Sequence, residues 1–279
     1  MFRKYGILGI LMILFAQINF FLKIQPFANW YFPIIWGGYI LVVDAIVYRL
    51  KKNSLLSNKP KKFAFLILMS SFFWWIFEFA NKMTENWGYS GLSGFGSETV
   101  ANAFGAISFA TVLPAVFETT ELIEAVHLFD HTKLHKKHRV TKRLLHLLFG
   151  IGILTFLLPL AFPRYFFPLV WVAFFFLLDP INFMHRQPSI IQHLRDRKLK
   201  TPLSLAIGGL ICGFFWEFWN YWAIPKWTYT IPFVGFLKIF EMPILGYLGY
   251  PVFAWELFSM YYFVKTLHIE ERLLYKEVA

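Results

Sequence analysis

Long apolar runs alternate with short polar or charged segments along the whole chain. Each run has about 20 residues or more, the length that a helix needs to cross the hydrocarbon core of a bilayer. The eight predicted spans are residues 5–22, 30–50, 63–81, 99–126, 144–162, 165–185, 202–222 and 243–267. The pattern predicts an all-α, polytopic membrane protein with eight transmembrane helices.

Composition favours the same fold class. Hydrophobic residues make up 58% of the 279 residues and charged residues only 15%, whereas soluble domains are roughly 45 to 50% apolar. The formal net charge is +11, but the basic residues fall in short runs between apolar segments, which is typical of contact with anionic lipid rather than nucleic acid. The single cysteine, Cys212, excludes a disulfide framework and a cysteine-based metal site.

The positions of the basic residues predict the orientation. With the N-terminus in the cytoplasm, 22 of the 27 Lys and Arg residues fall on the cytoplasmic side, as the positive-inside rule requires. The five on the outer side are Lys23, Lys82, Arg164, Lys226 and Lys238. No small-residue cleavage pattern follows the first apolar run, so we expect a retained helix there. We expect an integral protein of the bacterial inner (plasma) membrane with both termini cytoplasmic.

The second half of the sequence repeats the first. Residues 31–36 read YFPIIW and residues 166–171 read FFPLVW, and the same offset of 135 residues relates Asp44 to Asp179. An even number of helices in each half gives both halves one orientation, related by an axis along the membrane normal. The predicted four-helix repeats are residues 1–135 and 136–279. We expect the functional site where the two repeats meet.

Each half also carries the same polar and aromatic motif near the outer end of a span, Glu-x-x-Asn followed by Trp-x-Tyr. Its members are Glu78, Asn81, Trp87 and Tyr89 in the first half and Glu217, Asn220, Trp227 and Tyr229 in the second. A carboxylate and an amide three residues apart share one face of a helix. Inside a bilayer such groups normally face the interior of the bundle.

These residues are candidates for acid chemistry. Desolvation favours the uncharged form of a carboxylic acid, and an uncharged acid is a proton donor. The candidate catalytic residues are Glu78, Glu98, Glu217 and Glu241. The candidate substrate-binding residues are Asn81, Trp87, Tyr89, Trp216, Asn220, Trp227 and Tyr229. The structural alternative is hydrogen bonding between helices and, for Glu98 and Glu241, a charge effect at the start of a helix.

Other polar and aromatic residues are interpreted structurally. The acids nearer the cytoplasm are Asp44, Asp179, Glu118, Glu121 and Glu256. Because Arg49 and Arg186 follow the two aspartates within seven residues, ion pairs at the inner interface are favoured over a functional role. The Trp residues interpreted as an interfacial belt are Trp30, Trp36 and Trp171.

The histidines raise the question of a metal. His127, His131 and His135 are four residues apart, so a helical extension would align them as metal ligands, a loose likeness to membrane di-iron hydroxylases and desaturases. The chain has no His-x-x-His-His box, and the three stand among Lys and Arg residues. We favour a solvated basic loop and expect no metal and, without a nucleotide, haem or flavin motif, no cofactor.

The order of elements around the motif resembles a known family. A Trp and an acid or amide on one helix are followed by Trp-x-Tyr and then by a Glu and a Pro at the next helix. These positions are Trp216, Asn220, Trp227, Tyr229, Glu241 and Pro243 in one copy and Trp75, Asn81, Trp87, Tyr89, Glu98 and Pro114 in the other. The pattern, in two tandem copies, resembles the lycopene cyclase domain of the heterodimeric or fused membrane type.

The resemblance implies a cofactor-independent isoprenoid or carotenoid cyclase or isomerase. Two positions depart from the family. Its Pro-x-Glu-Glu segment is absent, and Glu241 and Pro243 stand there with one residue between them. Its Asp on the preceding helix is replaced by Asn81 and Asn220, which cannot donate a proton as an acid does.

Two functions fit these features. The first is an enzyme that protonates a double bond of an isoprenoid or other lipid, with Glu217 or Glu241 as the acid, Glu78 or Glu98 as the matching group, and aromatic rings around a carbocation. The second is a proton-coupled transporter or lipid-handling protein that uses the same cluster as its binding site. In both, the partner is a lipid or isoprenoid small molecule from the bilayer, and not nucleic acid.

Overall fold

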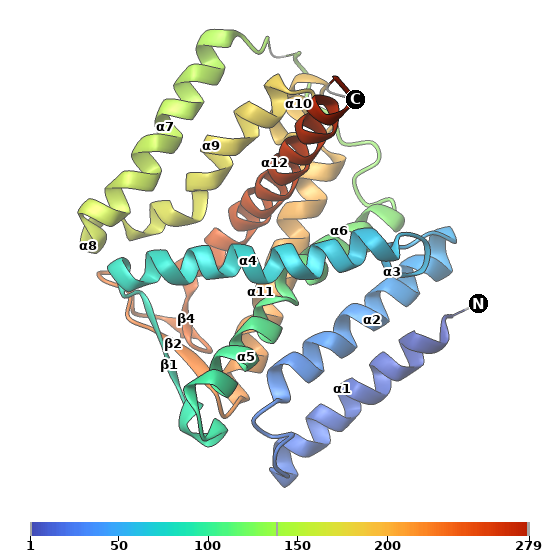
Figure 1. Cartoon of the computed structure of the whole chain (residues 1–279), viewed down its shortest axis with the longest axis vertical. Coiled ribbons are helices and arrows are strands. Elements are labelled where there is room, and N and C mark those ends of the chain that lie inside the picture. Colours follow the sequence, from blue (N-terminus) through green and yellow to red (C-terminus); the bar gives the residue numbers. More distant parts are fainter. Residues whose placement is uncertain (1, 138, 278–279) are drawn as a thin grey trace.

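Most of the chain is helical, as the apolar runs predict. The computed structural model describes residues 2–137 and 139–277 (Figure 1). The long helices are α1 (Lys4–Leu22), α2 (Tyr31–Lys51), α4 (Pro60–Thr84), α5 (Glu98–Phe109), α6 (Val112–Ala125), α7 (Lys142–Ala161), α9 (Val170–Met184), α11 (Lys200–Trp222) and α12 (Gly249–Glu277). The short ones are α3 (Leu55–Asn58), α8 (Pro163–Phe166), α10 (Ile190–Arg195) and the 3₁₀ helices η1 (Leu92–Phe95), η2 (Phe167–Leu169) and η3 (Ile244–Leu248).

Within the described residues, seven helical segments are long and apolar enough to cross a membrane, as in a multi-pass membrane protein. Two of them are composite: α5 and α6 are separated by a short break, and α8, η2 and α9 follow one another directly. Helix α12 is not among the seven, because residues such as Glu256 and Lys265 lower its hydropathy. It also begins at Gly249 rather than at residue 243. An eighth span therefore stays a prediction.

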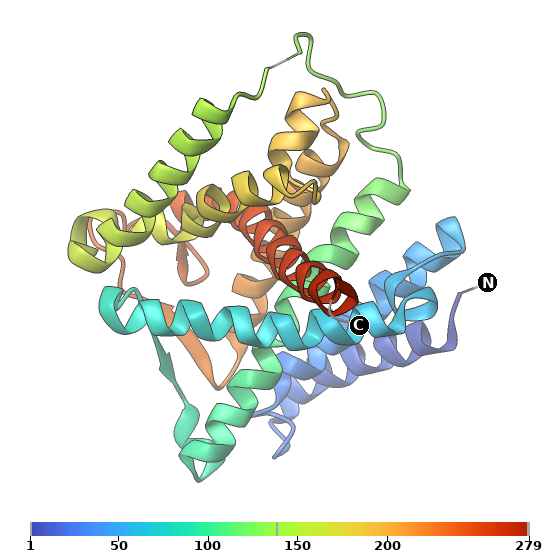
Figure 2. The same cartoon turned by 45° about the horizontal axis from the view of Figure 1, so that its top comes forward.

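The helices form two outer pairs with a central group between them. Helix α1 packs on α2, α7 packs on α9, and α4, α6, α11 and α12 lie between these pairs (Figures 1 and 2). Glycine permits the closest approach, because a Cβ on Gly9 would lie 2.6 Å from the Gly38 carbonyl oxygen, and one on Gly38 would lie 2.8 Å from the Gly9 oxygen. The outward faces carry exposed Leu, Ile and Phe side chains, as expected for contact with lipid.

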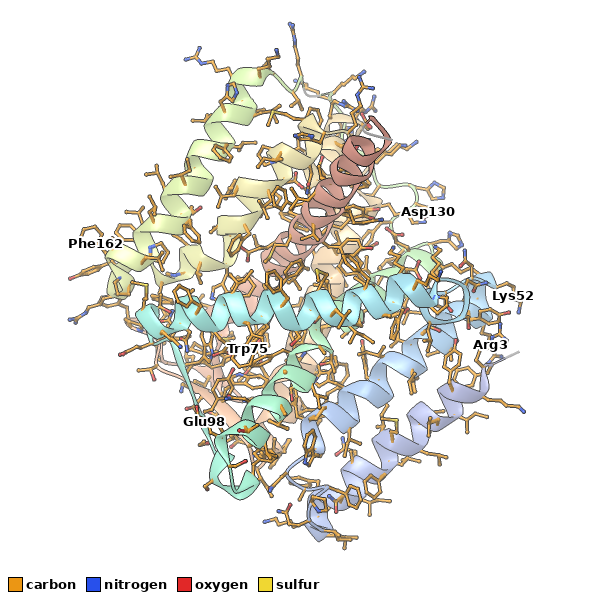
Figure 3. All side chains as sticks on the ribbon, in the orientation of Figure 1. Arg3, Lys52, Trp75, Glu98, Asp130 and Phe162 are labelled. Atoms are coloured by element: carbon orange, nitrogen blue, oxygen red, sulfur yellow. The ribbon has the colours of Figure 1, made fainter. Side chains whose placement is uncertain are left out.

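Charged and apolar positions separate along the molecule. Figure 3 shows Arg3, Lys52 and Asp130 toward one side and Glu98 and Phe162 toward the opposite side. This separation is consistent with the predicted topology, which assigns the first group to the cytoplasm and the second to the outer face. The orientation itself stays a prediction.

The fold is not purely helical, because the outer loops contain short strands. Strand β1 (Trp87–Ser90) pairs antiparallel with β2 (Lys226–Tyr229), and β3 (Lys238–Ile239) pairs antiparallel with β4 (Met242–Pro243). The all-α prediction therefore holds for the apolar segments and misses both ribbons. The first ribbon joins the two halves of the chain.

The buried aspartates are structural, but not through the ion pairs expected from Arg49 and Arg186. Asp44 accepts hydrogen bonds from the Leu56 amide at 2.8 Å and the Ser54 hydroxyl at 2.9 Å. Asp179 likewise accepts from the first amides of α10, at 2.8 and 2.9 Å. Both carboxylates thus satisfy N–H groups at the start of a short helix, which have no partner within the helix itself.

Two further expectations change in the structure. Helix α6 ends at Ala125, and residues 126–131 form turns, so His127 and His131 are not aligned on one helix. His127 Nδ1 lies 2.5 Å from Asp130 Oδ2. Trp36 is not an interfacial residue, because its side chain is fully buried in the core.

Candidate functional site

The two copies of the motif meet in the ribbon of β1 and β2. Trp87 pairs with Tyr229, and Tyr89 pairs with Trp227. Each strand follows one long helix, β1 after α4 and β2 after α11. The two Trp-x-Tyr segments, 140 residues apart in the sequence, are therefore adjacent in space.

The asparagines of the motif fix the position of these strands. Asn81 Oδ1 accepts from the amides of Asn86 at 2.9 Å and Trp87 at 3.2 Å, and its Nδ2 donates to the Trp87 carbonyl at 2.8 Å. Asn220 makes the matching pair with Trp227, at 2.9 Å from the amide and 2.8 Å to the carbonyl. Each side chain needs both a donor and an acceptor for this contact, so the geometry explains Asn at both positions.

Glu78 collects three hydrogen bonds on a single oxygen. Its Oε1 accepts from Trp74 Nε1 at 3.0 Å, from Trp87 Nε1 at 3.1 Å and from the Tyr89 hydroxyl. Trp74 comes from the same helix, one turn earlier, whereas the other two come from β1. Asn81 therefore places the strand and Glu78 receives its side chains.

Glu217 is fully buried on α11 and binds two tyrosines. Its Oε1 accepts from the Tyr229 hydroxyl at 2.7 Å and from the Tyr250 hydroxyl at 2.6 Å. Trp227 Nε1 donates to the Tyr229 hydroxyl at 2.8 Å, which makes a chain from Trp227 through Tyr229 to Glu217. Glu217 Oε2 has no hydrogen-bond partner among the described residues.

A glycine one turn before Glu217 makes room for Tyr250. A Cβ on Gly213 would lie 2.2 Å from a ring carbon of Tyr250, which is far inside van der Waals contact. The bare backbone at Gly213 therefore allows the first turn of α12 to approach α11. This approach brings the Tyr250 hydroxyl to Glu217.

A cavity of about 620 Å³ lies between the halves beside the ribbon, within the range of roughly 300 to 1,000 Å³ that is usual for ligand sites. Its wall comes from α4, β1 and α5 of the first half and from α9, α11, β2 and α12 of the second. The aromatic lining includes Trp74, Trp75, Trp87, Tyr89, Trp171, Trp216, Trp227, Tyr229 and Tyr250. Trp75 lies on α4 in Figure 3.

The structure separates the four candidate acids. Glu78 lines the cavity, and Glu217 lies directly behind Tyr229 and Tyr250. Glu98 is exposed at the start of α5, outside the lining. Glu241 also lies outside the lining, where its Oε1 accepts from Lys226 Nζ at 2.8 Å.

Glu241 also does not begin a helix as expected, because it lies in a turn before β4. Among the candidate binding residues, the tryptophans and tyrosines line the cavity, whereas the two motif asparagines do not. The geometry therefore brings Glu78 and Glu217 together with the aromatic candidates and leaves the other two glutamates aside.

Sequence reasoning missed several cavity residues. Tyr250 has no counterpart in the first half, since position 110, at the offset of the Trp-x-Tyr motif, is Ala110. Trp171 was interpreted as a belt residue but lines the cavity. Its match with Trp36 at the repeat offset was the one available signal. Asn86 and Ser108 also line the cavity, and nothing in the sequence pattern distinguished them.

The tyrosines of the ribbon stay protonated at neutral pH. Burial, and next the Glu217 carboxylate, raise the pKa of Tyr229 well above its ordinary value of 10.0. Burial and the nearby Glu78 raise the pKa of Tyr89 in the same way. Each hydroxyl therefore remains a proton donor to its glutamate.

Comparisons with protein-family models, with curated proteins and with solved structures find no match. The functional conclusion therefore depends on the site itself.

Proposed function

We propose that this protein is an integral membrane enzyme that moves protons to and from an isoprenoid or another lipid bound in the aromatic cavity. One observation carries the proposal. A glutamate from each half reaches the same cavity, Glu78 directly and Glu217 through the hydroxyls of Tyr229 and Tyr250. General acid and base groups on two sides of a bound substrate are the minimum that a proton-transfer reaction needs.

The second half supplies the proton. Glu217 does not touch the cavity, so a tyrosine hydroxyl stands between it and the substrate. Tyr229 gives its proton to one carbon of a double bond and takes the proton of Glu217 in return. The substrate becomes a carbocation, and Glu217 is left as a carboxylate that still accepts from both tyrosines.

The first half removes a proton. Glu78 faces the cavity, and its Oε1 accepts from three donors, an arrangement that suits a carboxylate. It takes a proton from a carbon next to the cation, which restores a double bond. The net result is an isomerisation or a cyclisation, without oxidation or reduction.

The aromatic wall stabilises the charged intermediate. Trp171, Trp216 and Trp227 line the cavity from three different elements. A cation within about 6 Å of an indole face is attracted by the ring quadrupole, most strongly when water is excluded. No separate counter-ion in contact with the cation is needed for this stabilisation.

The same proposal includes an architecture of two tandem four-helix repeats with eight spans and cytoplasmic termini. Three matched contacts support it: both motif asparagines bind their strand alike, both buried aspartates cap a short helix, and both tyrosines bind the glutamate of their own half. The ribbon register also exchanges Trp and Tyr about the pair formed by Gly88 and Thr228, as a two-fold axis along the membrane normal requires.

A second candidate is a proton-coupled transporter or a lipid-handling protein. The observation that favours it is the break between α5 and α6, because residues on both sides of the break, such as Ser108 and Val112, line the cavity. Discontinuous helices at a binding site between repeats are common in transporters. Flux of a labelled lipid across proteoliposomes that depends on a pH gradient would favour this candidate.

Deuterium incorporation tests the enzyme. The purified protein is reconstituted in nanodiscs in heavy water and incubated with lycopene, squalene or farnesol, and recovered lipids are analysed by mass spectrometry. We expect deuterium in one of these lipids and a loss of about 10² to 10⁴ in rate for Glu217→Gln. Glu98→Gln is the matched control outside the cavity. The enzyme proposal fails if no lipid gains deuterium above empty nanodiscs.

A further inference from the structure

Three buried polar side chains line the cavity without any partner in the described part of the chain. They are Asn86, 3% exposed, Ser108, 6% exposed, and Trp216, 5% exposed. The unpartnered atoms are both polar atoms of the Asn86 amide, the Ser108 hydroxyl and the Trp216 Nε1. Buried polar groups are nearly always hydrogen-bonded, so such a group on a cavity wall indicates a ligand or water there.

The Asn86 side chain has no visible role in the fold. Its backbone amide donates to Asn81 Oδ1 at 2.9 Å, and its carbonyl accepts from the Thr230 amide at 2.8 Å. Both ribbon contacts are therefore made by the main chain. This differs from Asn81 and Asn220, whose amides are fully engaged with the strands. The Asn86 amide is left free to bind a molecule in the cavity.

The three groups lie at different depths along the cavity wall. Asn86 follows the outer end of α4, whereas Ser108 lies ten residues into α5 after Glu98. At 1.5 Å per residue this places Ser108 about 15 Å below the start of that helix. A ligand that reaches both must be elongated, and the aromatic wall between them requires it to be apolar over most of its length.

The charges of the wall exclude an anionic head group. Among the described residues that line the cavity, Lys226 is the one with a basic side chain, and its Nζ donates to Glu241 at 2.8 Å. Glu78 adds a carboxyl group to the same wall. A phosphate or carboxylate would find no unpaired cation here and would approach Glu78. A hydroxyl or carbonyl group carries no charge and can use the Asn86 amide as donor and acceptor.

We propose that the cavity binds a neutral, elongated lipid with at least one hydroxyl or carbonyl group, and that Asn86 is the residue that recognises this group. Ser108 and Trp216 offer further hydrogen bonds deeper along the chain of the lipid. The proposal rests on the proposed function, since it names the substrate class of the same cavity. It excludes both pure hydrocarbons and phosphorylated isoprenoids as the preferred ligand.

Equilibrium binding tests it. Tritiated farnesol is titrated into the full-length protein in nanodiscs, with empty nanodiscs subtracted, and α-farnesene and farnesyl phosphate serve as competitors. We expect saturable farnesol binding and weaker competition by either analogue. Asn86→Leu should reduce farnesol affinity about tenfold, the effect of one lost hydrogen bond in a buried site, and leave α-farnesene binding unchanged.

Two controls keep the test clear. Asn86→Leu removes no contact of the fold, so its thermal unfolding should match or exceed that of the wild type. Asn53→Leu changes an exposed amide on the opposite side of the molecule and should leave farnesol binding unchanged. Saturable binding that is absent, equal for α-farnesene, tighter for farnesyl phosphate, or unaffected by Asn86→Leu overturns the proposal, and the last result shows that the amide binds only water.

The outcome is separable from that of the proposed function. Binding that depends on Asn86 without deuterium incorporation supports the neutral lipid and rejects the enzyme. Deuterium incorporation into lycopene or squalene, with binding that does not depend on Asn86, supports the enzyme and rejects the subsite.

Discussion

Trp87 of β1 lies opposite Tyr229 of β2 in an antiparallel ribbon. Tyr89 lies opposite Trp227 in the same ribbon, so the two Trp-x-Tyr segments face each other in exchanged order. Residues two apart on a strand share one face, and all four of these side chains line the cavity. One face of the ribbon is therefore a wall of the cavity, built equally by both halves of the chain.

The two halves use these side chains differently. In the first half Trp87 and Tyr89 both donate to Glu78. In the second half Trp227 donates to Tyr229, and Tyr229 donates to Glu217. The first arrangement concentrates donors on one acceptor oxygen, and the second is a chain along which a proton can move. This difference is the basis for assigning proton removal to the first half and proton donation to the second.

Loss of the Tyr229 hydroxyl interrupts this chain. Tyr229→Phe leaves Trp227 Nε1 without its acceptor and removes one of the two donors to Glu217. We expect deuterium incorporation in heavy water to fall by about 10² or more, because one positioned acid contributes about 10² to 10⁴ in rate.

A tyrosine outside the cavity is the control for this change. The hydroxyl of Tyr247 donates to the Ile239 carbonyl, and Tyr247 is not part of the lining. Tyr247→Phe should therefore keep the wild-type rate. A wild-type rate for Tyr229→Phe would contradict the role of this hydroxyl in proton donation.

The sequence predicted the glutamates and the aromatic residues of the motif but not the way they meet. Glu-x-x-Asn and Trp-x-Tyr are local patterns, and their duplication indicated a site between the halves. The pairing of β1 with β2 depends on contacts between residues 140 apart, which no local pattern reports. Likewise, the role of Tyr250 depends on space above Gly213 on another helix.

The acids were only partly predictable for a similar reason. Glu98 and Glu241 have the same residue type and lie in the same layer as the others, but what surrounds them decides their role. Glu241 is bound to Lys226, and Glu98 is exposed at a helix start. Burial and pairing arise from tertiary packing, so the pattern of residue types alone could not separate them from Glu78 and Glu217.

A side chain at Gly213 should displace Tyr250 from Glu217. The Cβ of Gly213→Ala would lie 2.2 Å from the Tyr250 ring, so α11 and α12 must move apart. We expect the free energy of unfolding to fall by about 1 to 3 kcal/mol, as is usual for overpacking. Deuterium incorporation should fall as well, and both are measured on protein in the same detergent or nanodiscs.

Gly150 provides the matched control for this substitution. It lies within α7, and no heavy atom lies within 4 Å of a Cβ placed there. Gly150→Ala should raise the free energy of unfolding by up to about 1 kcal/mol, because alanine is the better helix former. Equal effects at the two glycines would show that the space above Gly213 does not matter.

Replacing Asn220 by the acid found in the resembling family should weaken the fold. Asn220 Nδ2 donates to the Trp227 carbonyl at 2.8 Å, and Oδ1 accepts from the Trp227 amide at 2.9 Å. Asn220→Asp keeps the acceptor but places a carboxylate oxygen against a carbonyl oxygen. We expect a loss of about 1 to 3 kcal/mol in the free energy of unfolding, the cost of an unsatisfied buried group.

Chemical denaturation followed by tryptophan fluorescence measures this change. Asn53→Asp alters an exposed amide and should have an effect below about 0.5 kcal/mol, as is usual for surface substitutions. A stability of Asn220→Asp equal to that of the wild type would mean that the amide does not hold the strand.

The raised pKa of Tyr229 predicts a limit to stability at alkaline pH. Burial first, and then Glu217, keep the proton on the folded side chain beyond its ordinary pKa of 10.0. Below pH 10 the hydroxyl is protonated in both the folded and the unfolded chain, so its contribution to stability is constant. Above pH 10 the unfolded side chain ionises first, and that contribution is lost as pH rises toward the folded pKa.

The comparison of wild type with Tyr229→Phe isolates this residue from the other tyrosines. We expect the difference in their free energies of unfolding to stay constant between about pH 6 and pH 9 and to fall above about pH 10. Absorbance of tyrosinate should rise equally in both folded proteins up to about pH 10, because Tyr229 does not yet ionise. If the difference in stability already declines between about pH 6 and pH 9, the hydroxyl ionises too easily to serve as a permanent donor to Glu217.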